Sequence, residues 1–94
     1  MEKLIKYWQE KLKLNKWNII AKRILPEQIV YNGETYFIGI TRDNKNRKAT
    51  IYHDIDLYEE AIIHELLHLK YPTQSELWIN KETNKLLSYE KTSL

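Results

Sequence analysis

The chain contains no cysteine, only two glycines and two prolines, and only three histidines. The absence of cysteine excludes disulfide bonds and any zinc site built on thiolates, so a metal site here would need histidine and carboxylate ligands. No apolar run is long enough to cross a membrane, and the first residues lack the apolar stretch of a signal peptide. We therefore expect a cytoplasmic protein without a membrane segment.

The composition is that of one small folded domain. The 94 residues are 43% hydrophobic and 30% charged, a balance typical of a globular rather than a disordered chain. Aromatic residues make up 12% and provide bulky side chains for the core of so short a chain. The net charge of +2 comes without a basic block, so nucleic acid is not an expected partner.

Hydrophobic periodicity predicts helices at both ends of the chain and strands between them. Leu4, Ile5, Trp8 and Leu12 recur at helical spacing, and β-rich segments separated by turn signals such as Asn32-Gly33 follow. The predicted elements are a helix over 2–14, strands over 17–25, 35–40 and 49–53, a helix over 57–70 and a last helix over about 74–89. This order predicts a single α+β domain over residues 1–94, in which helices cover one face of a small three-stranded, mainly antiparallel sheet.

Two local patterns predict further structural details. Asp56 and Glu59 are spaced as a D-x-x-E capping box, which predicts that the helix over 57–70 begins beside them. The strand segment 49–52 could form a sheet edge that pairs with an extended peptide, or it could be an ordinary strand.

An H-E-x-x-H motif, His64-Glu65-Leu66-Leu67-His68, lies inside the helix predicted over 57–70, which is the context that this motif needs. At about 100° per residue the two histidines lie about 40° apart, so both imidazoles project from one face of the helix. Glu65 lies at the edge of that face. The opposite arc is apolar and would anchor the helix in the core: Ile62, Ile63, Leu66, Leu67 and Leu69.

This arrangement suits metal-assisted hydrolysis. Two neutral imidazoles and a third ligand can hold Zn2+ with one position open for water. The ion lowers the pKa of the water, and Glu65 can reach that water as the general base. The sequence therefore predicts a zinc metalloendopeptidase that acts on a peptide or protein substrate, with His64 and His68 as zinc ligands.

A function of a different class competes with this prediction. The same histidines could hold zinc in a non-catalytic, zinc-stabilised binding module, for nucleic acid if the lysine-rich surface is used, or they could merely pack and form hydrogen bonds.

The segment Ile63–Pro72, on a chain of 94 residues, resembles the minigluzincins, a family of minimal soluble zinc metallopeptidases. The specific motif residues fall between 56 and 78. The resemblance implies an opening helix, a three-stranded sheet, the active-site helix and a following helix that carries the third ligand. It also implies kinship with catalytic domains of integral-membrane metallopeptidases, and a latent form whose C-terminal segment guards the cleft.

The third ligand is the point at which this chain departs from related small zincins, which place a histidine shortly after a Pro-polar pair. Here Pro72-Thr73-Gln74 occupy that place, and no histidine follows His68. A downstream carboxylate of the gluzincin pattern is therefore expected, and the candidates are Glu76, Glu82 and Glu90.

Periodicity favours Glu76 among these carboxylates. In a helix over 74–89 it shares a stripe with Ile79, Thr83 and Leu87, which is the expected inward face. Thr73 and Glu76 also form a T-x-x-E capping box, so Glu76 could instead be only a helix cap.

Two other features leave alternatives open. Residues about 86–94 could occupy the cleft as an inhibitory tail, or they could be exchanged with a second chain in a homodimer formed through the C-terminal helix. His53 could be a ligand or a substrate contact, or it could be an ordinary hydrogen-bonded residue at a strand end.

Overall fold

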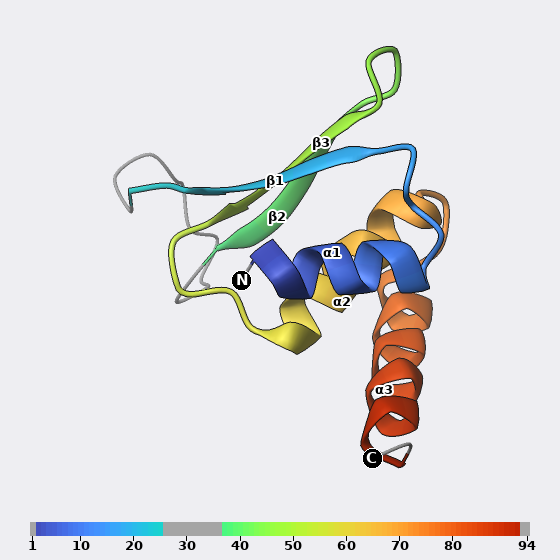
Figure 1. The fold of residues 1–94 in the computed structure, drawn as a ribbon. Helices are drawn as coiled ribbons and strands as arrows, with labels where there is room; N and C mark the ends of the chain where they lie inside the picture. The colour runs from blue at the N-terminus through green and yellow to red at the C-terminus, as the bar shows by residue number, and fades with distance from the viewer. Residues whose placement is uncertain (1, 26–36, 93–94) are drawn as a thin grey trace.

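The structure is a computed structural model that describes residues 2–25 and 37–92 (Figure 1). Its elements are α1 (Glu2–Lys11), β1 (Asn18–Arg23), β2 (Ile38–Asp43), β3 (Lys48–His53), α2 (Glu59–Lys70) and α3 (Glu76–Thr92). Helices α1 and α2 lie beneath one face of the sheet, and α3 packs against α2 and runs away from the sheet (Figure 1). The expected α+β domain with an N-terminal helix, a three-stranded sheet and two C-terminal helices is confirmed.

The sheet has the strand order β1-β3-β2 and is mixed. β2 pairs antiparallel with β3, and β1 pairs parallel with β3. Successive strands run in alternating directions, so a sheet with β2 at its centre would be wholly antiparallel. Because β3 lies between the other two, the β1–β3 pair is parallel, and the expected antiparallel pairing holds for β2 and β3.

β3 takes the centre because one of its faces is buried. Its alternate residues Ala49, Ile51 and His53 are buried, whereas β2 ends in the exposed residues Thr41, Arg42 and Asp43. Of the two alternatives for residues 49–52, the structure shows an ordinary strand and excludes a sheet edge, since β3 is paired on both sides. The expected turn at Asn32-Gly33 lies outside the described residues.

Helix α1 ends at Lys11, earlier than expected, because the chain enters left-handed backbone at Lys13, where φ is 58°. The Leu14 N–H donates to the Gln9 carbonyl at 2.8 Å, and the Lys13 N–H donates to the Glu10 carbonyl at 3.1 Å. This is the Schellman pattern of helix termination. The turn directs Leu14 and Trp17 into the core, where both are buried.

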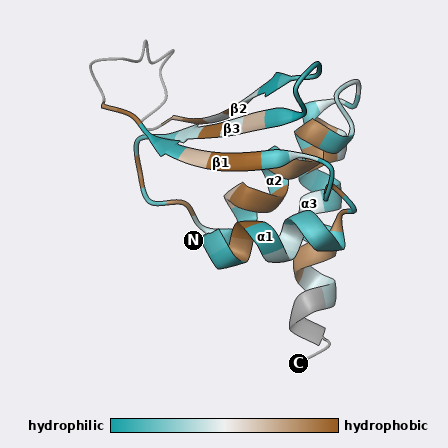
Figure 2. Ribbon diagram, turned by 45° about the horizontal axis from the view of Figure 1, so that its top comes forward, coloured by the Kyte–Doolittle hydropathy of each residue, from teal (hydrophilic) through white to brown (hydrophobic). Residues whose placement is uncertain are grey.

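An apolar layer fills the space between the sheet and the helices (Figure 2). Helix α2 supplies the largest share of it, so this helix is held along its length by hydrophobic burial. The buried members are Ile5, Trp8, Leu12, Leu14, Trp17, Ala49, Ile51, Ile62, Ile63, Leu66, Leu67, Leu69 and Ile79.

The start of α2 differs from the expected capping box. The N-cap residue is Tyr58, whose side chain makes no capping hydrogen bond. Asp56 pairs instead with Arg23 at 2.5 Å, and Glu59 accepts a 2.8 Å hydrogen bond from the indole N–H of Trp8. The expectation of a capping box is therefore wrong, because contacts with α1 and β1 take both carboxylates.

Both ends of α2 are fixed to other elements. At its start, the Trp8–Glu59 hydrogen bond joins it to α1. At its end, Arg42 of β2 donates a 2.9 Å hydrogen bond to the Leu69 carbonyl, one of the four that a helix end leaves without an internal partner. A helix held in this way presents its exposed face in a defined place.

Helix α3 continues to Thr92, beyond the expected end near residue 89. Leu86 and Leu87 are half-buried and pack against the core. No helix within 2–25 and 37–92 is both long and apolar enough to cross a membrane.

Candidate metal centre

The two motif histidines lie on the face of α2 that turns away from the core, as their spacing predicts. Their side chains are 24% and 25% exposed, and the ring centroids of His64 and His68 are 4.8 Å apart. The opposite side of the helix holds the predicted apolar anchors, each at most 2% exposed: Ile62, Ile63, Leu66, Leu67 and Leu69. The core therefore fixes the direction in which the imidazoles point.

The chain between α2 and α3 brings a carboxylate to these imidazoles. Tyr71, which follows α2, packs edge to face on Trp78 of α3 with ring centroids 5.0 Å apart. The Ser75 hydroxyl accepts a 3.2 Å hydrogen bond from the Trp78 N–H and so caps α3, whose first residue is Glu76. Because Ser75 provides the cap, the Glu76 side chain is left to face α2.

Glu76, His64 and His68 form one group that could hold a metal ion. The Nε2 atoms of the two histidines are 3.2 Å apart, and one Glu76 oxygen lies 3.3 Å from His64 Nε2. The other Glu76 oxygen contacts His68 Nε2. Ligand atoms around a tetrahedral zinc ion, at bond lengths of about 2.0–2.1 Å, lie about 3.3 Å from one another. Two of the three separations thus already match such a shell.

Glu65 occupies a buried position beside this group. Its side chain is on α2, the residue is 6% exposed, and its Oε2 atom has no hydrogen-bond partner among the described residues. Burial, and secondarily the nearby Glu76 carboxylate, raise the pKa of Glu65 to about 7. A carboxyl group with a pKa near neutrality is suited to accept and release protons at physiological pH.

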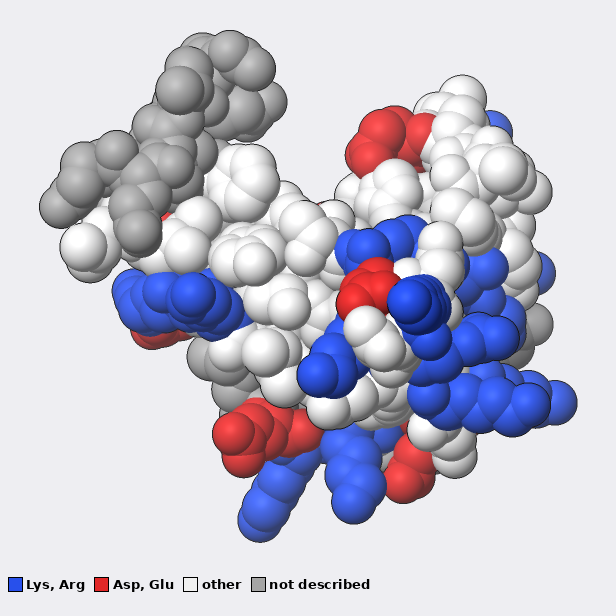
Figure 3. Space-filling view, turned by 90° about the horizontal axis from the view of Figure 1, so that it is seen from above, with Lys and Arg blue, Asp and Glu red and all other residues white. Residues whose placement is uncertain are grey.

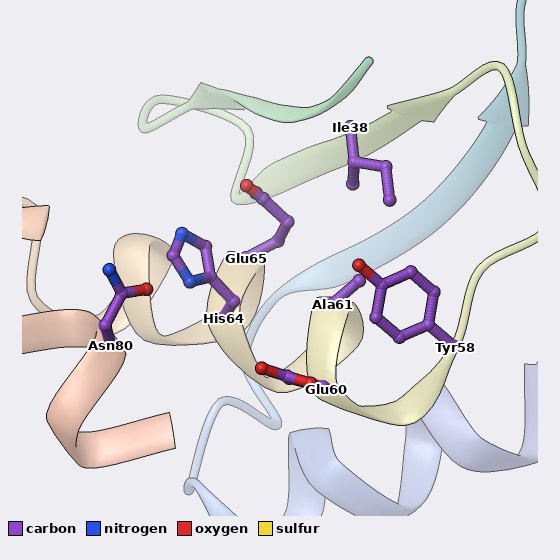
Figure 4. Close-up of a pocket in the computed structure, with 7 residues that line it drawn as sticks. All are labelled: Ile38, Tyr58, Glu60, Ala61, His64, Glu65 and Asn80. Atoms are coloured by element: carbon purple, nitrogen blue, oxygen red, sulfur yellow. The ribbon is translucent and has the colours of Figure 1, made fainter. Parts of the chain in front are cut away.

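A cavity of about 240 Å³ opens beside His64 and Glu65 (Figure 4). Three elements surround it, namely β2, the first two turns of α2 and the start of α3. The residues that line it are Ile38, Tyr58, Glu60, Ala61, His64, Glu65 and Asn80. The partnerless oxygen of Glu65 therefore belongs to a residue that borders open space next to the histidines.

Five of these lining residues were not singled out from the sequence: Ile38, Tyr58, Glu60, Ala61 and Asn80. Glu60 precedes His64 by one helical turn, so the same spacing argument that joined His64 to His68 could have found it. Tyr58 is next to it in the chain. Ile38 and Asn80 belong to other elements, and no local pattern connects them with the motif.

The other candidate residues lie elsewhere. His53 is 3% exposed on β3, and its Nδ1 atom is 2.8 Å from the Ile55 carbonyl oxygen, so it has the ordinary hydrogen-bonded role. Glu82 does not belong to the group that could hold a metal among the described side chains. The side chain of Glu90 lies outside the described residues.

The segment expected to act as a tail begins far along α3. Leu86 follows Glu76 by ten residues, which corresponds to about 15 Å of helix. From there the described chain continues away from the sheet (Figure 1). An exchange of this segment with a second chain stays a prediction.

The raised pKa of Glu65 predicts a pH-dependent cost in the metal-free protein. Because the carboxyl loses its proton near pH 4.5 in the unfolded chain but near 7 in the folded one, stability falls as the pH rises between these values. Glu65→Gln removes this titration. The measurement is urea unfolding with EDTA present. As the pH is raised from 4.5 to 8, we expect the free energy of unfolding of the variant to increase relative to that of the wild type by on the order of 3 kcal/mol.

Glu10→Gln removes the same charge from an exposed position and serves as the control for that comparison. It is expected to follow the wild type at both pH values. If the free energy of unfolding changed with pH in the same way in Glu65→Gln and in the wild type, the loss of stability at high pH could not be assigned to Glu65.

No family model, no curated protein sequence and no solved structure matches this chain. The side chains that α2 and α3 bring together are therefore the features of this chain that point to a function: His64, His68, Glu76 and Glu65.

Proposed function

We propose that this protein is a zinc-dependent metallopeptidase of the minigluzincin type. In this proposal His64, His68 and Glu76 hold the ion and Glu65 is the general base. The observation that carries the proposal is the meeting of two imidazoles and a carboxylate beside a buried carboxyl group, one oxygen of which has no hydrogen-bond partner in the described part of the chain. The donor set of two nitrogens and one oxygen is the His₂Glu set of catalytic zinc sites, which leaves a coordination position open.

The placement of Glu65 supports its role in proton transfer. A zinc ion in the site would lower the pKa of a bound water and polarise the scissile carbonyl. Glu65 would take the proton of the attacking water and deliver it to the amide nitrogen as the C–N bond breaks. Burial suits this role, because a carboxylate held away from bulk water is a stronger proton acceptor. The cavity beside His64 offers room for the substrate next to these groups.

The rival function, a non-catalytic binding module, has a basic region in its favour. Lysine and arginine side chains gather on one flank of the face seen in Figure 3. On the surface around Trp17 lie Lys13, Lys16 and Arg47, and the guanidinium groups of Arg42 and Arg47 stack on the Trp17 ring at 5.1 and 5.6 Å. Such a module would need zinc but not Glu65. Salt-dependent binding to DNA or RNA without hydrolysis of peptides would favour it.

The direct test is hydrolysis of unfolded protein by the full chain with and without zinc. We expect cleavage of a fluorescently labelled casein by the zinc-loaded chain, loss of cleavage with EDTA, and recovery when zinc is restored. His64→Ala should stay inactive under all three conditions, because it removes one of the ligands. Cleavage that is equal with and without EDTA, or none with zinc bound, would contradict the proposal.

A further inference from the structure

The cavity beside the metal group is acidic on its walls. Glu60 and Glu65 both line it, and no lysine or arginine does so among the described residues. The neighbouring carboxylates differ in their partners. Glu59 is held by the Trp8 indole, whereas Glu60 is exposed and has no hydrogen bond or ion pair with another described side chain. A carboxylate in that position is available to a ligand.

The remaining walls suit a long side chain that ends in a cation. Ile38 and Ala61 supply apolar surface, and the ring of Tyr58 stands beside Ala61 (Figure 4). Glu60 lines the same cavity. An aromatic ring and a carboxylate in one cavity attract ammonium and guanidinium groups through cation–π and ionic interactions. The volume of about 240 Å³ lies below the roughly 300–1,000 Å³ of pockets for drug-sized ligands, so it suits one side chain.

A second observation, which also supports the proposed role of Glu65, indicates that this cavity receives a ligand. The Oε2 atom of Glu65 is buried without a hydrogen-bond partner among the described residues, although buried polar atoms are nearly always paired. Glu65 borders the cavity, so a group that enters it can supply the missing donor. Glu60 lies one helical turn before His64, which keeps a cation paired with Glu60 away from the metal ligands.

We propose that this cavity binds a cationic nitrogen of the peptide substrate next to the scissile bond, contributed by a lysine or arginine side chain or by the amino terminus. Glu60 pairs with the charge, Tyr58 lies against it, and Ile38 and Ala61 contact the aliphatic part. This inference rests on the proposed peptidase function and assigns the substrate preference of that site.

The test compares blocked alanine pentapeptides whose central residue is lysine, norleucine or glutamate. Norleucine keeps the aliphatic stem of lysine and lacks the charge. Binding to the full chain in EDTA is followed by NMR chemical-shift titration, so no turnover is needed. We expect the lysine peptide to bind about tenfold more tightly than the norleucine peptide, with shifts at Tyr58 and Ala61. An unblocked all-alanine peptide tests the amino terminus as the source of the charge.

Variants of Glu60 decide whether this residue carries the preference. Glu60→Gln should remove the lysine preference, Glu60→Lys should reverse it towards the glutamate peptide, and Glu10→Gln on α1 should keep it. Equal binding of all blocked and unblocked peptides would overturn the proposal, and so would a preference that survives in Glu60→Gln.

The zinc-loaded chain separates this inference from the proposed function. If the zinc-loaded chain cleaves the peptides and its kcat/KM values show the same preference for lysine, both the cavity assignment and the peptidase proposal hold. If it cleaves them without preference, the cavity assignment fails and the peptidase stands. If the binding preference is present but no peptide is cleaved, the cavity assignment stands and the peptidase proposal fails.

Discussion

Glu65→Gln is expected to abolish peptide hydrolysis while zinc stays bound. Glutamine has nearly the shape of glutamate and keeps an acceptor oxygen, but it cannot accept a proton from water at neutral pH. Glu65 does not belong to the group of side chains that could hold the ion, so the substitution leaves His64, His68 and Glu76 in place. Loss of a general base lowers the rate by about 10²–10⁴-fold.

The measurement pairs kcat/KM with the zinc content of the purified variant. The expected stability gain of Glu65→Gln in metal-free protein above pH 7 means that lost activity will not reflect unfolding. Glu60→Gln is not a matched control here, because Glu60 lines the same cavity. Glu10→Gln is suitable, and it should keep both zinc and activity. Activity within about threefold of the wild type in Glu65→Gln would exclude Glu65 as the general base.

Glu76→Ala is expected to weaken zinc binding by about 100-fold or more. The substitution removes the carboxylate that contacts the imidazoles of both His64 and His68, so only two ligands would remain. Even residues that only support metal ligands contribute about 10–100-fold to affinity, and a direct ligand contributes more. Competition with a chromophoric chelator at pH 7.5 measures the effect.

Thermal unfolding gives a second reading of the same change. Zinc at 1,000 times its Kd stabilises the folded state by about 4 kcal/mol, and a 100-fold weaker site loses most of that gain. For a chain of this size we expect the zinc-induced rise in Tm to shrink by roughly 10 °C or more.

Glu82→Ala is the matched control, since it removes a carboxylate from the same helix outside the metal group. It should retain the zinc affinity of the wild type. If Glu82→Ala lost zinc and Glu76→Ala did not, the third ligand would be Glu82.

Much of the site could be predicted because its signals are local. The spacing of His64 and His68 places both rings on one face of a helix whatever the rest of the chain does. The apolar residues on the other face predict which side is buried, and Ile62, Leu66 and Leu69 are at most 2% exposed. The fold class followed in the same way from the order of helical and strand-like segments.

The structural details that the sequence did not predict depend on contacts with residues that are distant in the sequence. The capping box at Asp56 and Glu59 has the right spacing, but Arg23 and Trp8 compete for these carboxylates from elsewhere in the chain. The choice between an edge and an ordinary strand for residues 49–52 stayed open for a similar reason, since local sequence does not determine which strand lies at the centre of a sheet.

The sequence by itself determined that this protein has no thiolate ligands, that two of its three histidines share a helix face, and that any third ligand after His68 must come from a residue other than histidine. Only the tertiary structure decided that Glu76 is the carboxylate that meets them, since this follows from the packing of Tyr71 on Trp78 and the cap at Ser75. It also decided that Glu65 is buried beside a cavity shared by three elements. Periodicity is a property of neighbouring residues, whereas burial and the meeting of two helices depend on the packing of the whole domain.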